Sequence, residues 1–317
     1  MKKDSFWLEM EDQTSVFVQS WTDPSKQPAA IIQISHGMTE HSDRYQAFAE
    51  YLVDNDIFVF ANDHRGHGNT GDRQGLLGYF SEKDGFETVT NDLVEITKHI
   101  KNTYPDTPVI LLGHSFGSFV ARNYIQKHSE LLTGVILSGT ASHSQVELSF
   151  AKFLARLEII RKGKKGESKL LSRITSMGNT KHIPKPLTTR DWLTRDKEEI
   201  QKYINDPYCT FTPTASFFYD MFDGLTVIHD QQNITKIPSD LPILFISGTD
   251  DPVGNLGKGV QKVIDQYKQL NVGEVTAHFY PGGRHEMLNE ENKQEVFADI
   301  YEWTQTIVPS ASSRITK

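Results

Sequence analysis

The chain has 317 residues, of which 37% are hydrophobic and 23% are charged, and its formal net charge is −8. These values predict a soluble globular protein, and the negative charge argues against a general nucleic-acid binder. Cys209 is the only cysteine, which excludes a disulfide scaffold and a multi-thiolate metal site, and we expect it to be a bystander. No apolar run predicts a signal peptide or a membrane span, so we expect a cytoplasmic protein.

The first 141 residues alternate between apolar strand patterns and helix patterns. Strands are predicted at 6–8, 16–21, 30–35, 57–61, 109–112 and 134–139, and helices at 45–53, at 86–100 and from the turn near 117 to about 128. The first two strands predict a hairpin at a sheet edge, and residues 62–68 predict a polar, glycine-rich loop. This alternation indicates an α/β fold with a mostly parallel central sheet and helices on both faces.

The alternation stops at about residue 142, and no buried strand is evident up to residue 240. We interpret 142–240 as an inserted helical cap between a first core segment, 1–141, and a second, 241–308. In the second segment we predict strands at 242–248 and 275–280 and helices at about 257–270 and 293–307. The remaining residues, 309–317, predict a disordered tail.

The sequence Gly-His-Ser-Phe-Gly at 113–117 follows an apolar strand and precedes a helix pattern. This is the setting in which G-x-S-x-G places a nucleophilic serine on a sharp turn, so Ser115 is the candidate nucleophile. The glycines permit close crossing of strand and helix, and the Phe116 amide would lie at a helix N-terminus, where it stabilises an oxyanion. The alternative is an ordinary strand–turn–helix with an incidental serine.

A serine nucleophile requires a base and an acid that orients the base. Asp251 is our candidate acid, because it follows a predicted strand and precedes a turn at 252–253, and Asp250 is the alternative. The alternative role of either aspartate is to cap the following helix. His285 is the candidate base, since it follows the next strand and a glycine-rich turn, whereas His278 lies inside the strand. The order Ser, Asp, His is the one this architecture requires.

A second oxyanion donor is expected from the loop after the strand at 30–35, and we choose the backbone N–H of Met38. The residue before it, Gly37, allows a close approach. The histidines are scattered without a ligand set, so we expect no metal and no cofactor.

The combined motifs resemble the α/β-hydrolases of the monoacylglycerol lipase and lysophospholipase group, which overlaps the serine aminopeptidase-like hydrolases. The matching segments are His-Gly-Met-Thr-Glu-His at 36–41 with Arg44-Tyr45, Asp-His-Arg-Gly-His-Gly at 63–68, the serine motif at 113–118, Gly-Thr-Asp-Asp-Pro-Val at 248–253 and Gly-Arg-His-Glu at 283–286. The resemblance implies Asp251 as the acid and Met38 as an oxyanion donor. The chain departs from the group at Asn69-Thr70, where x-Ser is usual, and at Phe116, where lipases more often have methionine or leucine.

In this group a cap covers the active site and shapes the acyl pocket. An apolar stripe at helical spacing lies within the cap segment, at Phe150, Phe153, Leu154, Leu157 and Ile160. Basic residues accompany it, at Lys152, Arg156, Arg161, Lys162, Lys164 and Lys165. We favour packing of the stripe on the cap core with a solvated basic end. The alternative is that it lies on an anionic membrane surface and admits a lipid.

These observations predict a cofactor-independent serine ester hydrolase, and the resemblance implies a single-chain lipid ester as substrate, either a monoacylglycerol or a lysophospholipid. Two alternatives remain. An aminopeptidase or amidase on the same triad would use an acidic cluster in the cap to bind a free amine, with Asp206, Asp220 and Asp223 as candidates. A non-catalytic binding protein on this fold is disfavoured, because binding does not require all three catalytic groups.

Overall fold

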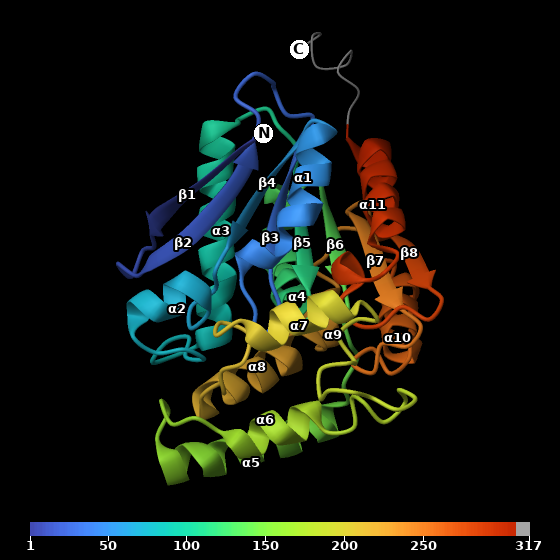
Figure 1. Ribbon diagram of the computed structural model, residues 1–317. Coiled ribbons are helices and arrows are strands. Elements are labelled where there is room, and N and C mark those ends of the chain that lie inside the picture. Colours follow the sequence, from blue (N-terminus) through green and yellow to red (C-terminus); the bar gives the residue numbers. More distant parts are fainter. Residues whose placement is uncertain (309–317) are drawn as a thin grey trace.

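The computed structural model describes residues 1–308, which form one eight-stranded sheet with helices around it (Figure 1). The strands are β1 (Lys2–Glu9), β2 (Ser15–Thr22), β3 (Ala30–Ser35), β4 (Ile57–Asn62), β5 (Val109–His114), β6 (Gly134–Ser138), β7 (Pro242–Gly248) and β8 (Glu274–Tyr280). Their order is β1-β2-β4-β3-β5-β6-β7-β8, and β2 pairs antiparallel with β1 and β4 whereas the other neighbours are parallel. The predicted fold class and the hairpin at the sheet edge are confirmed.

Helices cover both faces of this sheet. On one face lie α1 (Gln46–Asp54) and α11 (Lys293–Ile307), where the rings of Phe48 and Phe297 are 5.1 Å apart. The opposite face is covered by α3 (Gly85–Thr103), α4 (Phe116–His128) and α10 (Lys258–Gln269), which share one large apolar core. Short 3₁₀ turns occupy Ser42–Tyr45, Ser129–Leu131 and Met287–Asn289.

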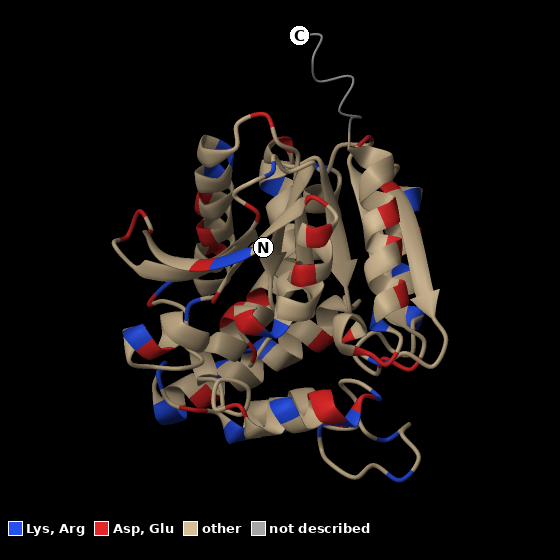
Figure 2. Cartoon of the chain, turned by 45° about the horizontal axis from the view of Figure 1, so that its top comes forward, with Lys and Arg blue, Asp and Glu red and all other residues tan. Residues whose placement is uncertain are grey.

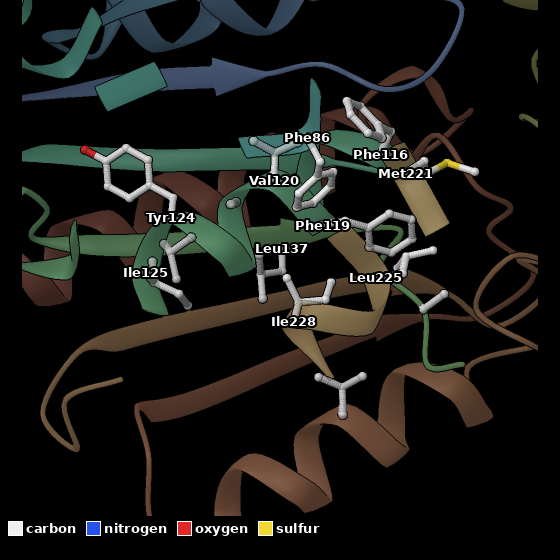
Figure 3. Close-up of a cluster of buried hydrophobic side chains, with 14 of the residues drawn as sticks. Phe86, Phe116, Phe119, Val120, Tyr124, Ile125, Leu137, Met221, Leu225 and Ile228 are labelled. Carbon is white, nitrogen blue, oxygen red and sulfur yellow. The ribbon is translucent and has the colours of Figure 1, made fainter. Parts of the chain in front are cut away.

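Five helices lie between β6 and β7 in sequence and cover the carboxyl ends of the strands (Figure 1). They are α5 (Gln145–Lys162), α6 (Lys169–Ser176), α7 (Lys197–Asn205), α8 (Ala215–Ile228) and α9 (Gln231–Ile234), and with their connections they are called the cap below. Apolar side chains of α4 and α8, among them Phe119, Met221 and Leu225, face one another and attach the cap to the core (Figure 3). The boundaries of the cap segment, 142–240, and of the core segments on either side of it stay a prediction. The tail predicted at 309–317 lies outside the described residues.

The helix α2 (Gly68–Gln74) was not predicted from the sequence, which indicated only a polar loop at 62–68. Its residues carry no apolar periodicity, so the usual helical signal is absent. Hydrogen bonds to Asp63 stabilise it instead: the amide of Asn69 donates to Oδ2 over 2.7 Å and the hydroxyl of Thr70 to the backbone carbonyl over 2.7 Å.

The apolar stripe of α5 packs on the core only through the half-buried Leu154, and its other four members face solvent, so the favoured packing of the whole stripe is wrong. Phe150 is 62% exposed and Ile160 is 82% exposed, and Phe153 and Leu157 are exposed as well. The helix has apolar residues on two faces. A second group of side chains, which includes Leu148 and Ala155, makes most of its contacts with the core. None of the described helices combines the length and the hydropathy needed to cross a bilayer.

Candidate active site

Ser115 lies on a strained turn between β5 and α4. Its φ of 51° and ψ of −119° are unusual for a residue with a side chain, and such strain is typical of functional sites. The Ser115 amide donates to the Ser138 carbonyl over 2.9 Å, and the Ser118 hydroxyl donates to the Ser115 carbonyl over 2.6 Å. These bonds hold the turn from both sides, so the Ser115 side chain is presented at the carboxyl edge of the sheet.

The structure brings Ser115, Asp251 and His285 together. The distance from His285 Nε2 to Ser115 Oγ is 2.8 Å, and His285 Nδ1 lies 3.0 Å from both carboxylate oxygens of Asp251. Asp251 follows β7 and His285 follows β8, and both are buried. An imidazole with its proton on Nδ1 would donate to Asp251 and leave Nε2 as the acceptor for the Ser115 proton.

The two competing sequence candidates lie elsewhere. Asp250 is exposed, and its amide donates to the Gly283 carbonyl over 2.9 Å. His278 contacts Asp299, with 3.3 Å between Nδ1 and Oδ2. Asp251 also accepts a hydrogen bond from the Val253 amide over 2.9 Å, so it stabilises the local turn as well as facing His285.

The loop that carries Met38 lies directly against the serine. A Cβ placed on Gly37 would be 3.2 Å from Ser115 Cβ, so a side chain there would crowd the nucleophile. The Gly37 amide donates to the Glu40 carboxylate, and His36 accepts the His64 amide at Nε2 over 2.9 Å. Among the described residues, neither the Met38 amide nor the Phe116 amide donates a hydrogen bond, so both remain available to an oxyanion.

A buried ion-pair cluster connects this loop to the loop that carries His285. Arg44 donates from Nη1 to Glu40 Oε2 over 2.8 Å and from Nη2 to Glu286 Oε2 over 2.6 Å. Burial opposes ionisation of Glu40, but the charge of Arg44, the nearby rings of His114 and His36 and the Gly37 amide together outweigh it and lower the pKa of Glu40 to about 2. Sequence reasoning quoted these residues within motifs but assigned them no role, because Arg44 and Glu286 are 242 positions apart.

The electrostatic environment favours protonation of His285 over that of the other histidines nearby. Burial lowers the pKa of His285, but the charge and hydrogen bond of Asp251 outweigh burial, and the net effect is a raised pKa. Burial lowers the pKa of His67 to about 3 and that of His114 to about 4. These two rings therefore stay neutral in the range where His285 titrates.

We therefore expect kcat/KM for an ester to fall as the pH drops through the His285 pKa, which lies above its ordinary value of about 6.5. The base must be neutral, so activity is present above that pKa and lost below it. Asp251→Asn removes the negative charge that raises the pKa of His285, so the acid limb of the pH profile should move to lower pH. The value of kcat/KM should fall as well. A pH–rate profile with a p-nitrophenyl ester measures both effects. His278→Gln is the control, and an unmoved limb in Asp251→Asn contradicts the assignment.

Ser115 and His285 line a cavity of about 340 Å³ beneath the cap. Apolar side chains line one part of it, including Phe119, Leu148, Met221, Phe222, Leu225 and Val253. The aspartates considered for binding an amine do not line it. Asp206 contacts His41, Asp223 contacts Lys152, and burial raises the pKa of Asp220 to about 7. A cavity with an apolar part suits an acyl chain better than a charged amine.

Three side chains with metal-binding donors meet where the cap contacts the core. His41, Asp206 and Cys209 place their donor atoms within 4.8 Å of one another, although sequence reasoning found no ligand set. His41 Nε2 and Asp206 Oδ2 already interact over 2.9 Å, and burial raises the pKa of the Cys209 thiol. A protonated thiol is a poor metal ligand, so this cluster fits a cap–core contact better than a metal centre.

The fold, the serine turn and the Ser–His–Asp arrangement define an α/β-hydrolase. Residues 26–292 match the family described as serine aminopeptidase, S33, and the chain belongs to that family. It is 28% identical to a monoglyceride lipase homolog of monkeypox virus, over 92% of this chain and 95% of the relative. It is 26% identical to the human monoglyceride lipase, over 94% of this chain and 89% of the relative.

A solved structure supports the same assignment of the fold and family. The chain aligns with a thermostable carboxyl esterase from Bacillus coagulans, in complex with glycerol, with a TM-score of 0.87 and 31% identity over 98% of this chain and all of that one. The resemblance to the monoglyceride lipase group is thereby confirmed. The chain is a hydrolase similar to monoglyceride lipases and esterases.

Proposed function

We propose that this protein cleaves carboxylic esters through an acyl-enzyme formed on Ser115. The observation that carries the proposal is the hydrogen-bonded chain from Ser115 Oγ to His285 Nε2, 2.8 Å, and from His285 Nδ1 to Asp251, 3.0 Å. Serine hydrolysis requires a nucleophile, a base and an acid that orients the base, and these groups meet that requirement at the wall of a cavity.

In the proposed reaction His285 takes the Ser115 proton as Oγ attacks the ester carbonyl. The Met38 and Phe116 amides hold the resulting oxyanion. His285 then gives the proton to the departing alcohol as the carbon–oxygen ester bond breaks, which leaves the acyl group on Ser115. His285 takes a proton from a water molecule, which attacks this acyl group. The bond between the acyl carbon and Ser115 Oγ then breaks, His285 returns the proton to Oγ, and the fatty acid is released. Asp251 keeps the imidazole oriented and stabilises its charged form throughout.

We propose a single-chain lipid ester as the substrate. The cavity of about 340 Å³ has an apolar part that fits one acyl chain, and the relatives are named monoglyceride lipases. An aminopeptidase, which the family description also covers, would need a free acidic group for the amine. Among the described residues, the carboxylates that line the cavity are occupied: Glu40 and Glu286 by Arg44, and Glu147 by the Ser144 amide and hydroxyl.

The solvent-facing stripe on α5 supports contact with aggregated lipid. Phe150 and Phe153 are exposed on the outer face, while Leu148 and Ala151 of the same helix line the cavity. Lysine and arginine positions are spread over the cap helices and its long loop (Figure 2). Several of the basic side chains beside the stripe pair with carboxylates, as Lys152 does with Asp223 and Lys165 with Glu82, so the apolar stripe itself carries the argument for a lipid surface. The cavity wall lies on the opposite side of the helix.

The test is hydrolysis of p-nitrophenyl esters of increasing chain length, beside an aminoacyl anilide and a monoacylglycerol. We expect serine-dependent turnover of medium and long esters, with Ser115→Ala inactive and the exposed Ser149→Ala as the matched control. The double variant Phe150→Ser/Phe153→Ser should slow turnover of the aggregated monoacylglycerol and leave that of the dispersed ester unchanged.

Turnover of the anilide alone would assign the triad to a peptidase. Equal effects of the α5 substitutions on aggregated and dispersed substrates would contradict the lipid-surface contact. Folded protein without turnover of any substrate would favour a non-catalytic binding protein.

A further inference from the structure

The cavity beside Ser115 has a second part with a different chemical character. Besides the apolar side chains, polar groups of α6 and of the loop that follows line it. These are Ser172, Thr175, Ser176, Asn179 and Arg190, which are called the polar wall below. Polar groups do not stabilise an apolar acyl chain, so the polar wall is available to the alcohol portion of an ester.

Arg190 is the only lysine or arginine among the described residues that line the cavity. Its guanidinium lies over the ring of Tyr203, 5.3 Å from the ring centre, and forms no ion pair with a described carboxylate. Arg44 differs in this respect, because its charge is neutralised by both Glu40 and Glu286. A half-buried arginine without an anionic partner, at the wall of a cavity, retains its full capacity to bind an anion.

One contact of Arg190 and one of its neighbour Trp192 place this segment near the reacting groups. Tyr203, beneath its guanidinium, is hydrogen-bonded through its hydroxyl to Thr39, with 2.8 Å between the oxygens, and Thr39 follows the oxyanion donor Met38. Two residues after Arg190, the ring of Trp192 lies 5.1 Å from that of His285. His285 delivers the proton to the departing alcohol, so the Arg190 segment lies on the side from which the alcohol leaves.

We propose that Arg190 binds a phosphate on the alcohol portion of the substrate. The proposal rests on the ester hydrolysis proposed above and narrows its substrate to a lysophospholipid with an anionic head group. Arginine binds phosphate oxygens through paired N–H donors, and the Ser172 hydroxyl and the Asn179 side-chain amide of the polar wall supply further donors. A neutral monoacylglycerol would fill the same cavity but leave the Arg190 charge without a counter-ion.

The test compares three lauroyl esters below their aggregation concentrations: 1-lauroyl-lysophosphatidate, 1-lauroylglycerol and p-nitrophenyl laurate. We expect wild-type protein to prefer the lysophosphatidate to the glycerol ester. Arg190→Gln should lower kcat/KM for the lysophosphatidate about 10- to 100-fold, the effect of one charge-assisted hydrogen-bonded contact, and change it less than about threefold for the other two. Arg190→Lys should retain part of the preference.

Arg173→Gln is the matched control, since Arg173 is exposed on α6 outside the cavity and its loss removes the same charge from the cap. Equal losses on all three esters, or the same preference in Arg190→Gln as in wild type, would overturn the assignment of Arg190 while ester hydrolysis stands. Absence of Ser115-dependent turnover of p-nitrophenyl laurate would overturn the proposed function itself. Thermal unfolding of each variant shows that it is folded.

Discussion

Ser115→Ala and His285→Ala are each expected to lower kcat/KM for an ester by about 10⁴-fold or more. The two side chains form one proton-transfer unit through the 2.8 Å hydrogen bond between Oγ and Nε2, so removing either one disables the other. The double variant should therefore be no slower than the slower single variant. The remaining rate should come from the Met38 and Phe116 amides and from substrate binding. Steady-state kinetics with a p-nitrophenyl ester measures all three variants.

Ser149→Ala on the exposed face of α5 is the control for this series, and it should retain the wild-type rate. If the losses in the double variant were the product of the single losses, Ser115 and His285 would act independently. That outcome would contradict the proposed mechanism.

Gly117→Ala is expected to destabilise the fold by about 3 kcal/mol or more. A Cβ at this position would lie 1.9 Å from the Ser35 carbonyl oxygen and 2.6 Å from the His36 carbonyl oxygen, both of which are backbone atoms. Neither can move without separating α4 from the end of β3, the point where the serine turn meets the oxyanion loop. Urea unfolding followed by circular dichroism measures the loss.

The matched control is Gly75→Ala, at the end of α2. Gly75 has a φ of 73°, but a Cβ there would meet nothing within 4 Å. Its replacement should cost only about 1 kcal/mol, from backbone strain. Equal costs at the two positions would contradict the claim that close approach, rather than backbone conformation, requires Gly117.

Much of the candidate site could be predicted, because each of its groups follows a recognisable strand. Strands β5, β7 and β8 are parallel, so their carboxyl ends meet at one edge of the sheet, and the residues that follow them come together there. Ser115, Asp251 and His285 all occupy such positions. The choice of Asp251 over Asp250 depended more on the resemblance than on spacing, and the 3.0 Å contacts with His285 agree with it.

Other features depend on contacts that sequence patterns do not encode. The cluster of Arg44 with Glu286 joins positions 242 residues apart, and nothing local indicates the pairing. The helix α5 has apolar residues on two faces, so periodicity alone did not show which face meets the core. Helix α2 has no apolar periodicity at all, and the bonds that stabilise it come from Asp63 in the preceding loop, whose position relative to the helix no periodic pattern indicates.

The most direct test of the central claim is covalent trapping of the nucleophile. The full chain is incubated with an alkyl fluorophosphonate, in which a serine oxygen displaces fluoride and forms a bond to phosphorus, and is then analysed by peptide mass spectrometry. We expect one phosphonyl group, on Ser115, and greatly slowed labelling of His285→Ala. Folded protein that remains unlabelled, or that is labelled elsewhere with Ser115→Ala labelled equally fast, would contradict that claim.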